Sequence, residues 1–215
     1  MLHELIKVWF HWVEQWGYGG VIILMAMESS IFPVPSEIVM PPAAFWAAQG
    51  KMSFWGVVGA GTLGSYLGSA ITYWVARLAG APLVRKYGKY FLLSEQKLDL
   101  AERWVQDYGL PGIFIARLMP VVRHLISIPA GVFKMSFGAF SVVTTVGAGL
   151  WCTILSWFGG RVIGEHPELL QSPEQMSAVI KSQLIWFIAA VLLIAVLYGV
   201  VVGMKIKRLQ KNLVV

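Results

Sequence analysis

Long apolar stretches alternate with short polar segments along this chain of 215 residues. The three longest apolar stretches cover residues 54–76, 138–160 and 184–204. Each approaches or exceeds the ~20 residues that a helix needs to cross a hydrocarbon core of ~30 Å. The pattern predicts an all-α integral membrane protein with spanning helices at 53–77, 137–161 and 182–204.

Apolar residues near the N-terminus recur at mostly helical spacing. They are Leu2, Leu5, Ile6, Val8, Trp9, Trp12, Val13 and Trp16. Because Trp favours the headgroup layer, we expect residues 1–16 to form an amphipathic helix that lies in the membrane interface. This segment lacks a basic region followed by an apolar run and a cleavage site, so we expect no cleavable signal peptide.

The composition supports a membrane protein and narrows its chemistry. Hydrophobic residues make up 57% of the chain and charged residues 13%, with a mean hydropathy of +0.68. The charged fraction is about half that of a typical soluble protein. The single Cys152 leaves no intrachain disulfide, and the GxGxxG pattern at 59–64 has no strand before it, as a dinucleotide site requires. We expect no cofactor, no metal and no nucleic-acid partner; the partners are membrane lipids, and a homo-oligomer stays open.

A repeated motif divides the chain into two similar halves. The tetrapeptide KMSF occurs at 51–54 and 134–137, each time at the start of a long apolar stretch. Prolines with the same spacing precede each copy: Pro33 and Pro42, then Pro120 and Pro129. These matches predict a duplicated unit of a hydrophobic hairpin followed by a spanning helix, and all four prolines are expected to break the hairpins.

Charge placement predicts the orientation of these segments. The 81–108 linker and the 205–215 tail are basic, whereas the 164–181 connection is acidic. By the positive-inside rule, the linker and the tail are cytoplasmic and the connection is an external loop. Because each spanning helix changes the side of the membrane, the helix that ends at the cytoplasmic linker starts outside, and the helix that ends at the external loop starts inside. The first KMSF is therefore outside and the second inside, so the repeats are inverted. The side of the N-terminus stays open.

The same parity predicts re-entrant hairpins. Residues 109–133 begin and end on the cytoplasmic side, with a break near Pro120. By symmetry, 17–50 forms a hairpin from the outer face, broken at Pro33 and Pro35, although a full span plus a shallow loop stays open there. The repeats then cover 17–80 and 109–163. Two inverted hairpins whose breaks meet near the midplane are the plan of a secondary transporter.

Ionisable residues lie beside both breaks. The first hairpin carries Glu28 and Glu37, and the second carries Arg117, Arg123 and His124. Each such group costs a few kcal/mol at membrane depth, so they should pair or share a ligand. One interpretation is two structural ion pairs, Glu28–Arg117 and Glu37–Arg123. The other is that the arginines bind an anionic phosphate headgroup, for which the guanidinium fork is suited, while the glutamates carry protons or act as gates. His124 is then a proton relay or a structural histidine.

Two local patterns have simpler interpretations. Gly61, Gly64 and Gly68 form a small-residue face that favours helix packing. Residues 93–109 predict an amphipathic helix on the cytoplasmic side, with Ser94 as its N-cap and Gly109 as its stop.

The glutamates eight residues apart around the proline break, together with ARLMPVVR and IPAG, resemble the DedA family, also called the SNARE-associated or VTT domain family. The resemblance covers roughly residues 17–165. It implies two re-entrant hairpins, a place in the bacterial cytoplasmic membrane and transport or scrambling of lipids, including recycling of undecaprenyl phosphate. Its functional acids match Glu28 and Glu37, and its paired arginines match Arg117 and Arg123. Many members have Gly before the second acid, where this chain has Ser36.

We therefore expect a transporter of a polyprenyl phosphate, coupled to protons or another ion, and not an enzyme. A phospholipid scramblase or flippase is a related alternative. An intramembrane lipid-phosphate phosphatase is a second one, for which Ser36 and His124 are the nearby candidates for nucleophile and base.

Overall fold

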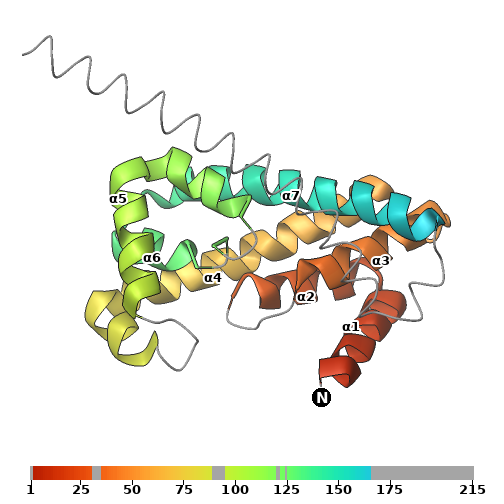
Figure 1. Cartoon of the computed structure of the whole chain (residues 1–215), viewed down its shortest axis with the longest axis horizontal. Helices are drawn as coiled ribbons and strands as arrows, with labels where there is room; N and C mark the ends of the chain where they lie inside the picture. Colours follow the sequence, from red (N-terminus) through yellow and green to blue (C-terminus); the bar gives the residue numbers. More distant parts are fainter. Residues whose placement is uncertain (1, 31–34, 89–94, 120–121, 124, 166–215) are drawn as a thin grey trace, which may run out of the picture. The chain divides into compact units, whose positions relative to one another are not determined.

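The computed structural model describes residues 2–30, 35–88, 95–119, 122–123 and 125–165, and these contain helices and turns but no strand (Figure 1). The all-α class is thus confirmed for this part of the chain. The predicted helix at 182–204 and the tail at 205–215 lie outside it. The helices are α1 (Leu2–Trp16), α2 (Tyr18–Glu28), α3 (Ser36–Ala48), α4 (Phe54–Gly88), α5 (Glu95–Arg117), α6 (Ser127–Val132) and α7 (Phe137–Glu165).

Glycines in the left-handed region set several helix ends. Gly17 separates α1 from α2 with φ 52°. Gly80, with φ 70°, interrupts α4, and Gly109, with φ 53°, interrupts α5 at the residue where the sequence indicates a stop. A residue with a Cβ is strained at such angles, whereas glycine is not. The second part of α5, residues 110–117, therefore runs in its own direction.

The sequence suggested that all of the repeated prolines break helices, but two of them lie inside helices. Pro42 lies inside α3 and Pro129 inside α6, so the prediction that these two residues break the hairpins is wrong. Pro129 is the third residue of α6, where an amide has no intrahelical acceptor and its loss costs little. Pro35 immediately precedes α3 with φ −71°, while Pro33 and Pro120 are outside the described residues.

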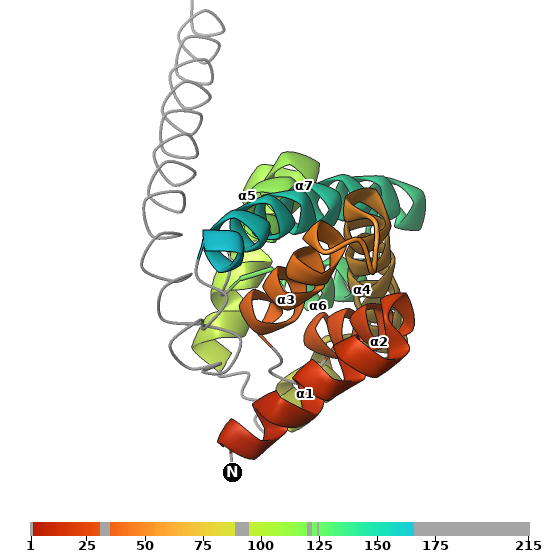
Figure 2. The same cartoon turned by 90° about the vertical axis from the view of Figure 1, so that its right-hand side faces the viewer.

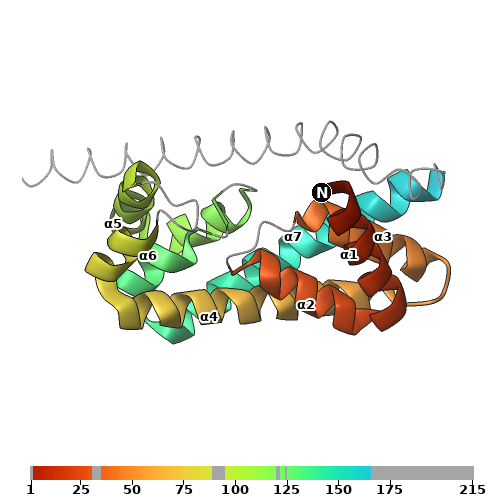
Figure 3. The ribbon, with the colours of Figure 1, turned by 90° about the horizontal axis from the view of Figure 1, so that it is seen from below.

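The two long helices α4 and α7 lie side by side and antiparallel (Figures 1 and 3). Tyr66 is hydrogen-bonded to Ser141 at 3.2 Å, and Tyr73 stacks on Phe140. Each of the helices α2, α3, α5 and α6 packs mainly on one of the two long helices. Helix α2 packs on α4 and α5 packs on α7, whereas α3 packs on α7 and α6 packs on α4. Helix α1 lies across α2 and α3 (Figure 2).

Small residues let these helices approach closely. A Cβ added to Gly64 or Gly68 of α4 would lie 2.4 Å from the carbonyl oxygen of Ile22 or 2.1 Å from that of Ala26, both in α2. These distances are far inside van der Waals contact, so the α2–α4 contact requires glycine. The small-residue face is therefore a packing surface, as the sequence indicated.

The two KMSF copies fold alike. Before the first, the amides of Gly50 and Lys51 bond to the carbonyls of Ala47 and Trp46, closing α3 with the hydrogen bonds of a Schellman motif. At the second copy the same two bonds lie one residue further along the motif, since the amides of Lys134 and Met135 bond to Gly131 and Ala130, closing α6. The left-handed residue is therefore Gly50 (φ 78°), just before the first copy, and Lys134 (φ 51°), the first residue of the second. A long helix then begins at the Phe of each copy.

The long helices expose apolar side chains and enclose polar ones. The exposed apolar positions include Leu63, Leu67, Ile71, Val75 and Leu78 of α4, and Val142, Val146, Leu150 and Trp157 of α7. An exposed apolar surface of this extent is typical of a protein surrounded by lipid. By length and composition, one helix in the described part of the chain, Phe137–Arg161, could cross a membrane.

Candidate functional site

Two pairs of helix ends lie close together beside the long helices (Figures 1 and 3). The first tip is the end of α2 and the start of α3; the second tip is the end of α5 and the start of α6. Glu28 and Ser36 belong to the first tip, Arg117 and Arg123 to the second, and all four side chains are buried. The structure thus brings the predicted residues Glu28, Arg117 and Arg123 into one cluster. Glu37 lies in the first turn of α3, 8% exposed.

An ion pair joins the two tips. The guanidinium Nη2 of Arg123 donates to Oε1 of Glu28 and, at 2.5 Å, to Oγ of Ser36. The same Oε1 accepts the backbone N–H of Ser36 at 3.2 Å. One carboxylate oxygen therefore fixes both the second tip and the first residue of α3. Breaking such a buried pair by removing one partner costs about 3–5 kcal/mol.

Trp151 of α7 supports this pair from one side. The Arg123 guanidinium carbon lies 5.0 Å from the centre of the Trp151 ring, within range of a cation–π interaction. The indole N–H of Trp151 donates to Oγ of Ser36 at 3.3 Å, and the side chain is 1% exposed. The sequence patterns did not indicate Trp151, and they suggested Ser36 only as a candidate nucleophile. A Trp in the middle of an apolar helix, away from the interface that Trp favours, is the signal that could have identified it.

Arg117 has a different set of partners. Its Nη1 donates to Oγ of Ser69 and to the carbonyl of Arg123, both at 2.8 Å, and its Nη2 donates to Oγ of Ser127 at 2.7 Å. The absence of a Cβ on Gly147 makes room for it, since an added one would lie 2.8 Å from the Arg117 Cβ. All of these hydrogen-bond acceptors are neutral.

The interpretation that pairs Glu28 with Arg117 is therefore wrong, although it was only one of the two that the sequence left open. Arg117 is the last residue of α5 and is held among serines of α4 and α6, whereas Arg123 follows the turn and reaches the first tip. Glu28 consequently pairs with Arg123. The predicted relay His124 lies outside the described residues.

Both guanidinium groups keep an unused donor. The Nε atoms of Arg117 and Arg123 are buried and have no hydrogen-bond partner among the described residues. A buried donor without an acceptor costs about 1–3 kcal/mol, so an oxyanion that reached these atoms would gain bonds that the described residues do not supply. The cluster can therefore bind an anionic group whose oxygens accept from guanidinium forks.

Comparisons with known proteins agree with the motifs. A model of the VTT domain matches residues 32–161. The undecaprenyl phosphate transporter A of Bacillus subtilis (strain 168) is 37% identical over 156 residues, which cover 73% of this chain and 77% of the relative. The protein of the same name in Staphylococcus aureus (strain NCTC 8325 / PS 47) is 32% identical over 143 residues, covering 65% and 70% of the two chains.

Another relative carries a different kind of name. An alkaline phosphatase-like protein of Lactococcus lactis subsp. lactis (strain IL1403) is 34% identical over 163 residues, covering 74% of this chain and 76% of its own. No solved structure matches the chain. The match to the VTT domain spans more than half of the chain, and the first relative confirms it over most of the length of both proteins. The chain belongs to the VTT domain family, the DedA family that its proline breaks and paired charges resemble.

Proposed function

We propose that this protein carries a lipid with an anionic phosphate headgroup, undecaprenyl phosphate, across the bacterial cytoplasmic membrane. The observation that carries the proposal is the buried Glu28–Arg123 pair between the two tips, beside two guanidinium Nε atoms without acceptors. Relatives named as transporters of this lipid support the choice of substrate. A phosphate is the ligand for which these guanidinium groups are chemically suited.

In this proposal the two helix pairs are inverted re-entrant hairpins. The packing of the helices supports the repeat. In each half, the first helix of the pair packs on that half's own long helix (α2 on α4, α5 on α7), and the second packs on the long helix of the other half (α3 on α7, α6 on α4). The hydrogen bond from the amide of Ser53 to Tyr18 Oη at 2.7 Å brings the chain after α3 back to the start of α2. The basic linker and tail then face the cytoplasm.

Competition for Arg123 would couple the lipid to a proton. A phosphate that binds the Arg123 fork displaces the Glu28 carboxylate, because both oxyanions use the same donor. The displaced carboxylate, buried and without its cation, takes up a proton from the open side. When the phosphate leaves on the other side, Glu28 releases the proton and pairs with Arg123 again. One proton then accompanies one phosphate, and Arg117 holds the second tip in place.

Reconstituted vesicles test the proposal directly. Protein is placed in liposomes with undecaprenyl phosphate in one leaflet, and its appearance in the other leaflet is measured together with lumenal pH. We expect Arg123→Ala to abolish transport and Arg123→Lys to restore only part of it, since an ammonium group cannot reproduce the fork. Lys134→Gln, which removes an exposed cation, is the control. Normal transport by Arg123→Ala would refute the role of the cluster, and transport without proton movement would refute the coupling.

The name of the Lactococcus relative favours one alternative, a lipid-phosphate phosphatase. Ser36 would be its nucleophile, but its Oγ accepts hydrogen bonds from Arg123 and Trp151 and is not paired with a base in the described residues. Purified protein mixed with the lipid distinguishes the two activities, because a transporter leaves the phosphate on the lipid and a phosphatase releases it.

A further inference from the structure

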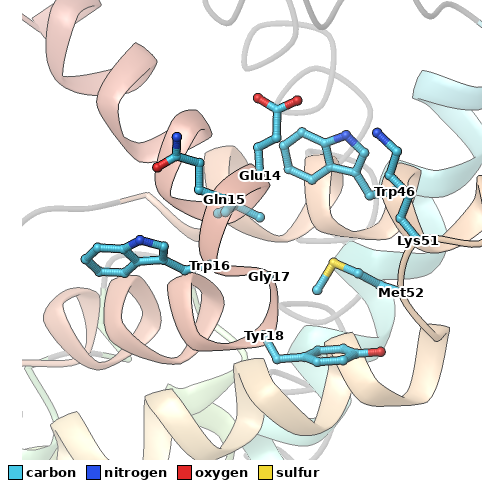
Figure 4. Close-up of a pocket in the computed structure, with 9 residues that line it drawn as sticks. Glu14, Gln15, Trp16, Gly17, Tyr18, Trp46, Lys51 and Met52 are labelled. Carbon is cyan, nitrogen blue, oxygen red and sulfur yellow. The ribbon is translucent and has the colours of Figure 1, made fainter.

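A second site lies at the other end of the first helix pair. A pocket of about 330 Å³ opens between the end of α1, the start of α2 and the turn after α3 (Figure 4). Tyr18, which lines it, begins the helix that ends at Glu28, so the pocket is roughly 15 Å along α2 from the charged cluster. It is therefore distinct from the Glu28–Arg123 site.

Backbone geometry fixes the shape of this pocket. Gly17 and Gly50, both in the left-handed region, make the turns on its two sides. The amide of Lys51 is bonded to the carbonyl of Trp46 at 3.0 Å, and the hydroxyl of Tyr18 accepts the amide of Ser53 at 2.7 Å. The walls thus depend on main-chain hydrogen bonds and are preorganised for a ligand.

The pocket contains donors and an acceptor that the protein leaves unused. The Trp46 side chain is only 9% exposed, yet its indole N–H has no hydrogen-bond partner among the described residues, whereas those of Trp104 and Trp151 do. This N–H is not among the polar atoms sealed inside the protein, so a ligand in the pocket can reach it and accept its hydrogen bond. Figure 4 shows this nitrogen on the same side of the pocket as the Lys51 ammonium, with the Glu14 carboxylate across the Trp46 ring. Neither Glu14 nor Lys51 forms an ion pair within the part of the chain described.

We infer that this pocket binds the zwitterionic headgroup of a membrane aminophospholipid, such as phosphatidylethanolamine. The phosphate oxygens accept from Trp46 Nε1 and from Lys51, and the lipid ammonium lies against the Glu14 carboxylate and the Trp46 ring. A headgroup that carried only phosphate would leave the Glu14 charge unpaired beside an anion. The site therefore selects a zwitterion over the phosphate-only headgroup of the transported lipid. Trp16 and Tyr18 at its rim suit the headgroup layer.

Native mass spectrometry of the purified full chain tests this inference. Protein is mixed with phosphatidylethanolamine, phosphatidylglycerol or undecaprenyl phosphate, and the retained lipid is quantified. We expect phosphatidylethanolamine to be retained best. Trp46→Phe keeps the ring but removes the N–H, and Lys51→Gln removes the charge, so each should weaken retention about tenfold or more. Glu14→Gln should remove the preference over phosphatidylglycerol.

Matched controls exist elsewhere in the chain. Trp55→Phe changes an exposed Trp outside the pocket, and Lys134→Gln changes the lysine of the second KMSF; both should retain phosphatidylethanolamine as the unaltered protein does. Equal retention of phosphatidylglycerol by the unaltered protein, or equal effects of Trp46→Phe and Trp55→Phe, would overturn the inference. Loss of undecaprenyl phosphate alone from Trp46→Phe would also overturn it, because the pocket would then belong to the transported lipid. Trp46→Phe separates the two proposals, since it should weaken phosphatidylethanolamine retention and leave undecaprenyl phosphate transport in the vesicle assay unchanged.

Discussion

Replacement of Glu28 by Gln removes the negative charge beside Arg123 but keeps the size of the side chain. The carbonyl of the new amide can still accept the Ser36 amide, which bonds to Glu28 at 3.2 Å. The change removes the charge that compensates a buried guanidinium, whose other contacts among the described residues include the neutral Ser36 Oγ and the Trp151 ring.

The size of the effect follows from these contacts. Breaking a buried ion pair costs about 3–5 kcal/mol. Because the serine and the indole ring continue to stabilise the cation, we expect the low end of that range, about 3 kcal/mol for Glu28→Gln. Arg123→Gln should cost a similar amount, since it leaves the carboxylate buried. The double variant Glu28→Gln/Arg123→Gln has no uncompensated charge, so it should be about 2–3 kcal/mol more stable than the sum of the single changes predicts.

Denaturant unfolding of the four proteins in one detergent, followed by circular dichroism, measures this cycle. Arg117→Gln combined with Glu28→Gln is the control, because the structure gives Arg117 neutral partners only, and its effect should add to that of Glu28→Gln. Additive losses for Glu28 and Arg123, or a loss below about 1 kcal/mol for Glu28→Gln, would show that the two charges do not stabilise each other.

Three further predictions concern other parts of the structure. Trp151→Phe keeps the ring beside Arg123 but removes the donor to Ser36, so transport should weaken with unchanged binding of lipid, whereas Trp151→Leu should reduce both; equal effects in the vesicle assay would contradict the positioning role. Gly50→Ala should lower the free energy of unfolding by about 1 kcal/mol and Lys134→Gly should raise it by about as much, because both positions are left-handed; changes of the same sign would argue against backbone strain. In a variant without the native cysteine, Ser53→Cys should react with an impermeant thiol reagent from outside and Ser136→Cys from inside; labelling from one face would disprove the inverted repeat.

The parts of the fold that depend on local sequence could be predicted. The apolar stretches indicated the long helices, and KMSF marked where both begin, because the start of a helix after a turn depends on a few neighbouring residues. The predicted breaks at Pro42 and Pro129 were wrong. Pro129 lies in the first turn of α6, where no intrahelical bond is lost, and whether a helix accepts Pro42 in its interior depends on the surrounding helices.

The site could be predicted by residue type but not by pairing. Charged residues at membrane depth must find partners, so Glu28 and the arginines were expected to come together. Which arginine reaches Glu28 depends on the rotation of each helix and on the turn between Arg117 and Arg123, which are long-range properties. The contribution of Trp151 could not be derived for the same reason, because it comes from a helix more than a hundred residues after Ser36.

The exchange of packing partners between the halves imposes an order on assembly during synthesis. Helix α6 packs on α4, which is already made when α6 leaves the ribosome, so the second hairpin can dock at once. Helix α3, buried along nearly its whole length, packs chiefly on α7, which begins about 90 residues later. At ordinary translation rates this interval lasts roughly 5–20 s. The newly made α3, with its prolines and Glu37, must therefore wait in or beside the membrane without its partner, and a chain that stops before α7 leaves that surface open to insertion factors and proteases.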